Sequence, residues 1–462
     1  MKARDDVGRV RGCDARERLA VGPHRVLPGG ARREEQPRPD HVAPRGVQGG
    51  CCGERLLAAR AGGAGRGHVQ RYDRAVSQAP PSTRVGAAIR AQFPIFETTA
   101  YLNSCSQGAL SHRVRDAVAA WLEGWDANGA EWDFWVERNE EFRSAIARLL
   151  HAEADDVAVT TSVSQGVSGL VSALALDGDR NRIVISEYEF PTIGQIAHAQ
   201  ELRGAEVIHV RPDPDGAIPP ERFAEAIDER TALVCCTTLS YRSGHRHDVT
   251  AIAESAHAAG ALVLADSYQA CGAVDLDVAS LGADAITGGT VKYLLGTAGL
   301  GFMWVRREVR DALLPTQTGW FADEDIFAMS IADYSPHASA RRFDSGTPPV
   351  PALYAGVAGV SLVEETGVPA IAEHVSGLVG RLLDGLGSLG ATVVTPTDPA
   401  RRGPLVCVRS NDVEALVAAL AEDRIVTSSR EDKLRVALHL YNVDEDVDAL
   451  LAALERNRAL LA

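Results

Sequence analysis

The chain contains little lysine, few aromatic residues and no long apolar run. Only three of its 47 basic side chains are lysines, namely Lys2, Lys292 and Lys433, and aromatic residues make up 5% of the 462 residues. No apolar run approaches the roughly 18 residues that a membrane-spanning helix needs. No apolar stretch follows the basic first residues, so a secretory signal is not expected. We therefore predict a protein with no membrane partner.

The eight cysteines also lack a pattern. They form no C-x-x-C pair and no regular spacing, and four of them occur as two adjacent pairs, Cys51–Cys52 and Cys235–Cys236. Adjacent cysteines rarely bridge each other. We therefore expect reduced thiols, a cytoplasmic protein and no metal site.

The net charge of −15 is unevenly distributed. Residues 1–88 hold 17 Lys/Arg against 9 Asp/Glu, whereas residues 89–462 hold 30 against 53. The acidic body argues against a nucleic-acid partner. Residues 1–88 are rich in Arg, Gly, Ala and Pro and show neither helical nor strand periodicity. We predict a disordered extension there, and we expect that it lies upstream of the true start of the protein.

From residue 89 onward, apolar segments of strand length alternate with helical patterns, which indicates an α/β fold with a mainly parallel sheet covered on both faces. We predict an N-terminal arm and a large domain over 89–349, and a smaller α+β domain over 350–462 with strands at Ala391–Val394, Leu405–Arg409 and Leu434–Leu440. The strands predicted for the large domain are Val157–Thr161, Arg182–Ser186, Glu206–Val210, Ala232–Thr237, Ala261–Asp266, Ala285–Thr287 and Gly301–Val305.

Lys292 lies in the apolar, glycine-rich stretch Ala285–Gly301, a poor place for a solvated charge. The chain uses arginine almost wherever a cation suffices, so this lysine points to a need for an amine. An amine can condense with an aldehyde to form a Schiff base, and apolar surroundings lower its pKa toward a reactive value. The alternative is a lysine whose stem is buried while its ammonium reaches solvent.

Two further loops carry polar groups at predicted strand ends. The turn Thr160–Ser168 is rich in hydroxyl groups and precedes a helix, which favours phosphate binding, or simple N-capping by Ser164. It lacks the Gly-Lys-Ser/Thr of a nucleotide-binding P-loop. Asp266 directly follows a buried strand, where it could pair with a ring nitrogen or cap the next segment. An anion site, this carboxylate and Lys292, in that order, match the needs of pyridoxal phosphate.

With these motifs, residues 95–460 resemble the class V aminotransferase family of pyridoxal-phosphate enzymes, which includes cysteine desulfurases, kynureninase and isopenicillin N epimerase. Ala265–Ala270 resembles the family's Asp-x-x-Gln/His element, and Thr290–Leu294 resembles its lysine motif. The resemblance implies fold type I with a seven-stranded sheet and a Schiff base on Lys292. It also implies that Asp266 pairs with the pyridine nitrogen and that Gln269 lies near the phenolic oxygen.

The same resemblance implies further cofactor contacts. Ser164 and Gln165 fall on the phosphate loop, and Phe190 falls where the family stacks a ring on the cofactor. Arg342–Pro348 resembles the segment that reaches the neighbouring subunit's phosphate. Gly346 and Thr347 would then act in trans, and a homodimer would share its active sites.

On the substrate side, Leu434–Asn442 resembles the strand whose arginine binds the α-carboxylate of an amino acid. Arg435 is the candidate, because a bidentate guanidinium–carboxylate pair fixes the orientation of the α-carbon; the alternative is a surface ion pair. Ser240–Gly244 resembles a run found in kynureninases. We expect the substrate side to be lined by Ser104–Gln107, Tyr241, Arg242, Trp320 and Arg430.

The sequence departs from individual members of the family. The segment Asp423–Lys433 lacks the desulfurase cysteine, and Val291 stands where desulfurases have His and kynureninases Tyr. We therefore expect an enzyme acting at the α-carbon of an amino acid. Transamination is favoured, and carbon–sulfur or carbon–carbon lyase chemistry competes with it. An epimerase and an inactive dimeric homologue are the alternatives, and the complete set Asp266, Gln269, Lys292 and Arg435 counts against the last.

Overall fold

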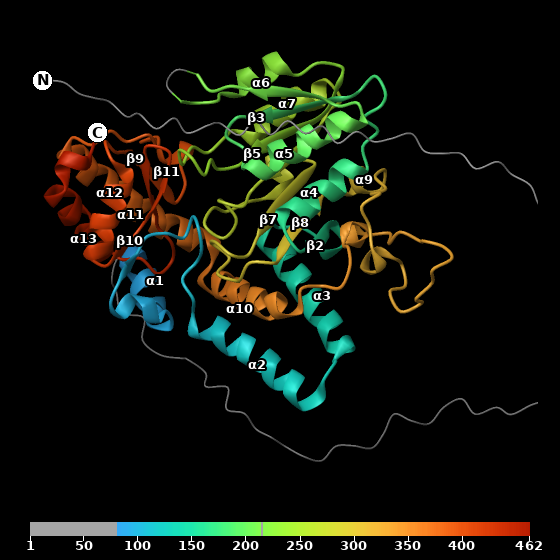
Figure 1. Ribbon diagram of the computed structural model, residues 1–462, viewed down its shortest axis with the longest axis horizontal. Helices are drawn as coiled ribbons and strands as arrows, with labels where there is room; N and C mark the ends of the chain where they lie inside the picture. The colour runs from blue at the N-terminus through green and yellow to red at the C-terminus, as the bar shows by residue number, and fades with distance from the viewer. Residues whose placement is uncertain (1–80, 214–215) are drawn as a thin grey trace, which may run out of the picture. The chain divides into compact units, whose positions relative to one another are not determined.

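The computed structural model describes residues 81–213 and 216–462 (Figure 1). Its first element is helix α1 (Pro81–Ile89). Regular structure therefore begins earlier than residue 89, the start that the sequence predicts. The rest of the extension predicted over 1–88 lies outside the described residues. Among the helices that the structure describes, none is both long and apolar enough to cross a membrane.

A seven-stranded sheet forms the centre of the larger part of the fold. Its order is β2-β8-β7-β6-β5-β3-β4, and only β8 runs antiparallel to its neighbours β2 and β7. The other pairs are parallel, which confirms the α/β class and the mainly parallel sheet. The strands are β2 (Val157–Thr160), β3 (Arg182–Ser186), β4 (Glu206–Val210), β5 (Thr231–Thr237), β6 (Leu262–Asp266), β7 (Ala285–Gly289) and β8 (Gly301–Val305).

Helices cover both faces of this sheet because its strands are apolar on both sides. Along β3, Val184 packs into one buried cluster while Ile183 and Ile185 pack into another, as expected when successive side chains point to opposite faces. The first cluster includes residues of α3 (Trp132–Leu149), α6 (Pro220–Ala226) and α7 (Val249–Ala258). The second includes residues of α4 (Val163–Ser172) and α5 (Pro191–Ala199).

The C-terminal elements gather at one end of the fold, in red in Figure 1, beside α1. They are α11 (Val368–Leu389), α12 (Val413–Glu422), α13 (Asp444–Arg456) and a sheet of order β11-β12-β9, made of Ser428–Arg430, Lys433–Ala437 and Leu405–Arg409. Helix α10 (Val350–Thr366) packs against α2 (His112–Asn128) and α3. The strand expected over Ala391–Val394 is wrong: a single bridge joins Val393 to Val408.

Two short connections place the N-terminal arm. Strand β1 (Ala100–Tyr101) pairs in parallel with β10 (Ile425–Val426), so the arm adds to the C-terminal elements and not to the large sheet. The loop after β1 then returns toward the large sheet, where Gly108 donates a backbone hydrogen bond to Val291. Residues from the arm, the large sheet and the C-terminal strands therefore meet near Lys292. Two short helices, α8 (Val278–Leu281) and α9 (Arg307–Arg310), precede β7 and follow β8 in the chain.

Candidate active site

A cavity of about 310 Å³ lies at the carboxyl ends of β5 and β6, beside the first turn of α4. Ligand sites of open parallel sheets lie at this edge, and the volume is at the lower end of the roughly 300–1,000 Å³ typical of such pockets. Its lining is Thr161–Ser164, Phe190, Thr192, Thr237, Leu239, Tyr241, Asp266, Tyr268, Gln269, Lys292 and Ala298–Leu300. Six residues predicted for the site therefore meet in one cavity: Ser164, Phe190, Tyr241, Asp266, Gln269 and Lys292.

Lys292 lies on the turn that follows β7, and Gly289 at the end of β7 leaves room for the ring of Tyr268. A Cβ on Gly289 would lie 2.6 Å from the Tyr268 ring, so only glycine admits that ring here. The Lys292 ammonium lies 4.2 Å from the centroid of the Tyr268 ring and 5.7 Å from that of Phe190. Burial lowers the pKa of Lys292 to about 8, against the opposing attraction of Asp266. The amine can therefore lose its proton near neutral pH, as a nucleophile or base requires.

Asp266 and Gln269 lie deep in the same cavity. Asp266 Oδ1 accepts a hydrogen bond from the Tyr268 N–H at 2.9 Å. Burial raises the pKa of Asp266, while that N–H and the charge of Lys292 oppose the rise. Gln269 Nε2 donates to the Cys105 carbonyl at 3.0 Å, and its buried Oε1 has no hydrogen-bond partner among the described residues. A buried acceptor of this kind is costly unless a ligand or water donates to it.

The N-terminus of α4 opens onto the cavity. Ser162 is the N-cap and accepts from the Gln165 N–H at 3.1 Å, so the alternative in which Ser164 caps the helix is wrong. The Ser164 hydroxyl lies 3.1 Å from that of Thr192 instead. Free N–H groups at the start of this ten-residue helix, together with three hydroxyls, favour an anion.

Gln165, Gly346 and Thr347 lie outside the lining of this cavity. Both ends of the Gln165 amide are used within the fold: Oε1 accepts from the Thr161 N–H at 3.3 Å, and Nε2 donates to the Phe343 carbonyl at 3.2 Å. All three residues line a separate cavity of about 20 Å³. Within one chain, the structure does not bring these residues to Lys292.

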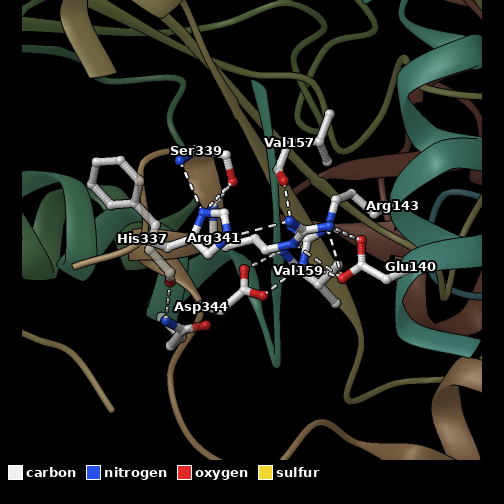
Figure 2. A network of polar contacts seen from close by, with 10 residues as sticks. Glu140, Arg143, Val157, Val159, His337, Ser339, Arg341 and Asp344 are labelled. Atoms are coloured by element: carbon white, nitrogen blue, oxygen red, sulfur yellow. Dashed lines mark hydrogen bonds and ion pairs between the residues drawn. The ribbon is translucent and has the colours of Figure 1, made fainter. Parts of the chain in front are cut away.

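A buried ion pair holds the segment that leads to Gly346. In Figure 2 the Arg143 guanidinium lies between the carboxylates of Glu140 and Asp344. Arg143 Nη2 donates to Asp344 Oδ2 at 2.7 Å, and Asp344 Oδ1 accepts from the Val159 N–H at 2.8 Å. Arg143 also donates to the Val157 carbonyl. These bonds satisfy backbone groups along the edge strand β2, which leads directly into the first turn of α4.

Arg435 lies on β12 and is only 4% exposed. Its guanidinium donates hydrogen bonds to residues of three other segments of the chain. Its Nη1 donates to the Tyr241 carbonyl at 3.2 Å, and its Nη2 donates to the hydroxyls of Ser106 and Ser428 at 3.1 and 3.0 Å. Its Nε has no hydrogen-bond partner among the described residues. Arg435 does not line the Lys292 cavity, but its positive charge is one of the causes that lower the pKa of Lys292, after burial.

The other residues expected on the substrate side are more scattered. Arg242 donates to the Glu187 carbonyl at 3.0 Å and pairs with Glu431. The Ser104 hydroxyl is buried against the Tyr441 hydroxyl at 2.6 Å. Arg430 lies over the Tyr241 ring at 5.7 Å. Trp320 packs on Trp132, with centroids 5.6 Å apart, and is not part of the cavity lining.

Sequence reasoning missed Tyr268, Thr192 and Thr237 as lining residues. Tyr268 directly precedes Gln269 in the motif Ala265–Ala270, so its position carried a usable signal. Thr192 follows Phe190 by two residues and lies in the first turn of α5. Thr237 carried no signal beyond its place at a strand end.

Comparisons with known proteins now add to this geometry. The family model described as Aminotransferase class-V matches residues 100–450. The chain belongs to the class V aminotransferase family. Members of this family use pyridoxal phosphate, and both the predicted family and the predicted cofactor are thereby confirmed.

Individual relatives of this class V chain differ in their named activities. It is 32% identical over 358 residues to the uncharacterized aminotransferase YcbU of Bacillus subtilis, covering 78% of this chain and 94% of that protein. It is 29% identical to the kynureninase of Pseudomonas fluorescens, covering 75% and 86%.

Solved structures agree on the fold. The cysteine desulfurase of Thermococcus onnurineus aligns with a TM-score of 0.73 at 21% identity, covering 83% of this chain and 99% of that one. The cystine C–S lyase C-DES, solved with cysteine persulfide, aligns with a TM-score of 0.72 at 21% identity, covering 79% and 99%. These likenesses confirm the predicted fold type I architecture.

Proposed function

We propose that this class V enzyme acts at the α-carbon of an amino-acid substrate and that transamination is its reaction. The observation that carries the proposal is the half-buried amine of Lys292, with a pKa lowered to about 8, in one cavity with Asp266 and the N-terminus of α4. The relation to an aminotransferase over 94% of its length supports this choice of reaction.

The residues of the cavity fit pyridoxal phosphate. The N-terminus of α4 and Ser164 would hold the phosphate, and Asp266 would hold the ring nitrogen. The buried, unpartnered Oε1 of Gln269 suits a protonated group on the ring. Phe190 is 44% exposed, which leaves an aromatic face toward the cavity for stacking. When bound, the cofactor supplies an aldehyde for an amine and a ring that withdraws electrons from the substrate's α-carbon.

Lys292 and Asp266 then divide the proton chemistry. The uncharged Lys292 amine would hold the cofactor through its aldehyde, and the same amine would be placed to take a proton from the substrate's α-carbon. Burial raises the pKa of Asp266, while the Tyr268 N–H and the charge of Lys292 favour its ionised form. Its role is to hold a proton on the ring nitrogen, because a buried carboxylate favours a neighbouring cation.

Arg435 is proposed to bind the α-carboxylate, and a homodimer is proposed to complete the phosphate site. The Nε of Arg435 supports the first role, because it is a buried donor that finds no acceptor in the part of the chain that the structure describes. Gly346 and Thr347 line a cavity apart from Lys292, and this supports a role toward the neighbouring subunit. The separate sheets before and after residue 350 support the proposed division into two domains.

A lyase is the second candidate function, because a kynureninase is 29% identical over 369 residues. A persulfide-forming desulfurase is disfavoured, because the segment Asp423–Lys433 before Arg435 contains no cysteine. An epimerase remains the third candidate.

The test of the reaction type is a half-reaction with the cofactor-loaded full chain. Individual amino acids are added without an acceptor, and the products are identified by mass spectrometry. We expect an oxo acid and the aminated cofactor in equal amounts. Release of a β-substituent would instead establish the lyase, and exchange of the α-proton without loss of nitrogen would establish the epimerase.

Arg435→Lys is expected to raise the KM for amino acids by about 10–100-fold, because a charge-assisted hydrogen bond is worth roughly 1.5–3 kcal/mol. The kcat should change much less. Turnover of an amine that lacks the α-carboxylate should be unaffected. The matched control is Arg409→Lys on the adjacent strand β9, whose side chain pairs with Asp432 at the surface. An equal loss for both amine and amino acid would remove Arg435 from carboxylate binding.

A further inference from the structure

Glu189 is a buried acid in the turn that connects β3 to Phe190. Its side chain is 7% exposed. Oε1 accepts a hydrogen bond from the Ser186 hydroxyl at 2.7 Å, and Oε2 has no hydrogen-bond partner among the described residues. The backbone N–H of Thr237 also faces the carboxyl group. Glu189 is therefore hydrogen-bonded to the end of β3 and lies near the end of β5, one residue before Phe190.

The groups around Glu189 are acids or neutral groups. Asp266 acts on it from the end of β6, and the thiols of Cys235 and Cys236 face it from β5. The ion pairs formed by the described residues do not include Glu189. Burial raises the pKa of Glu189 to about 8, Asp266 adds to the rise, and the Ser186 hydroxyl and the Thr237 N–H oppose it.

Asp266 and Glu189 thus compete for one negative charge. Two buried carboxyl groups near each other do not both ionise easily, and the proton stays on the one with the weaker support. Asp266 has the charge of Lys292 and the Tyr268 N–H in its favour. Glu189 has hydrogen-bond donors but forms no ion pair with a cation among the described residues. The proton therefore belongs on Glu189.

We propose that Glu189 is a neutral positioning residue that holds Phe190 at the cavity and leaves Asp266 as the carboxylate of the site. The positioning follows from the contacts to Ser186 and Thr237, which fix the turn from which the Phe190 ring reaches Tyr241, with centroids 5.3 Å apart. The role of Asp266 toward the ring nitrogen rests on the proposed function. The neutrality of Glu189 does not rest on it and can be tested without cofactor.

The first test compares the full chain without cofactor to its Glu189→Gln variant in thermal melts from pH 5 to pH 9. A carboxyl whose pKa rises from 4.5 to about 8 on folding binds more protons when folded, so it costs stability as pH increases through that window. Glutamine removes this cost. The Tm of the variant relative to the wild type should therefore rise between pH 5 and pH 8 and then level. Glu422→Gln, at the exposed end of α12, should give a flat difference.

The second test uses infrared difference spectra of the same two proteins. The wild type should show the carbonyl band of a protonated carboxyl at pH 6, absent from Glu189→Gln and lost from the wild type above pH 9. A Tm difference that is flat or falls with pH, or the absence of that band at pH 6, would overturn the proposal.

The third test adds pyridoxal phosphate. Glu189→Gln should bind it at pH 7 with the wild-type affinity and the same visible spectrum. In Glu189→Asp the side chain is shorter by one methylene, which moves the carboxyl away from the Ser186 hydroxyl. This variant should bind pyridoxal phosphate at least tenfold more weakly. Wild-type affinity in Glu189→Asp would refute the positioning role. If the wild type itself shows no visible band, the proposed function fails while the melts still decide the state of Glu189.

Discussion

Lys292→Ala is expected to lower turnover by about 10²–10⁴-fold, the range found when a positioned acid–base group is removed. The loss follows from the two tasks proposed for one amine, binding the cofactor aldehyde and moving the α-proton. The side chain is half-buried and its pKa is lowered to about 8, so the uncharged form is available near neutral pH. The measurement is steady-state turnover with the amino acid identified in the half-reaction, together with the visible spectrum of the cofactor-loaded protein.

Lys292→Arg is the matched control because it keeps the positive charge and the length but has no reactive primary amine. It should be as inactive as Lys292→Ala. Added small primary amines should restore part of the turnover of Lys292→Ala, because they replace the missing base, and should not help Lys292→Arg. Melting temperatures of both variants should stay near that of the wild type. Turnover above one tenth of the wild-type value in Lys292→Ala would show that another residue moves the proton.

The sheet and the chemistry at its edge could be predicted because each depends on short stretches of sequence. Strands such as Arg182–Ser186 contain a continuous apolar run, here Ile183–Ile185, and parallel strands end at one edge, so the sequence alone could place Asp266 and Lys292 together. The one strand predicted wrongly, Ala391–Val394, is a short segment with a single bridge to Val408. Its pairing depends on a partner strand and not on its own pattern.

Contacts between distant segments could not be predicted. Gln165 lies on the expected phosphate loop, but its amide binds Phe343, which is 178 residues away in the chain, and so it is absent from the cavity lining. Glu189 carried no sequence signal either, because its neutrality depends on Asp266 and β5 rather than on its neighbours in the chain. Local patterns indicate which residues reach the sheet edge, but not which way each side chain turns.

The buried pair of Arg143 and Asp344 is a contact of this kind, with its residues 201 positions apart. Arg143→Met is expected to lower the free energy of unfolding by about 3–5 kcal/mol, because it leaves a buried carboxylate without its cation. Arg143 is fully buried, and the carboxylates of Asp344 and Glu140 raise its pKa despite the cost of burial, so it is charged throughout the accessible pH range. Urea denaturation of the full chain measures the loss.

The matched control lies on the same helix. Arg138 pairs with Glu141 at a partly exposed position, so Arg138→Met should cost at most about 1 kcal/mol. Combining Arg143→Met with Asp344→Asn should recover part of the loss, because the unpaired charge is removed as well. Equal costs for Arg143→Met and Arg138→Met would mean that the buried pair does not stabilise the fold.

Arg143→Met should also affect the cofactor site, because the buried ion pair holds strand β2. Asp344 holds the Val159 N–H and Arg143 holds the Val157 carbonyl, and this strand leads directly into Thr161 and the first turn of α4. If the edge of β2 loosens, the N–H groups proposed to bind phosphate lose their fixed arrangement. Arg143→Met should therefore weaken pyridoxal-phosphate binding more than Arg138→Met does, although neither arginine lines the cavity.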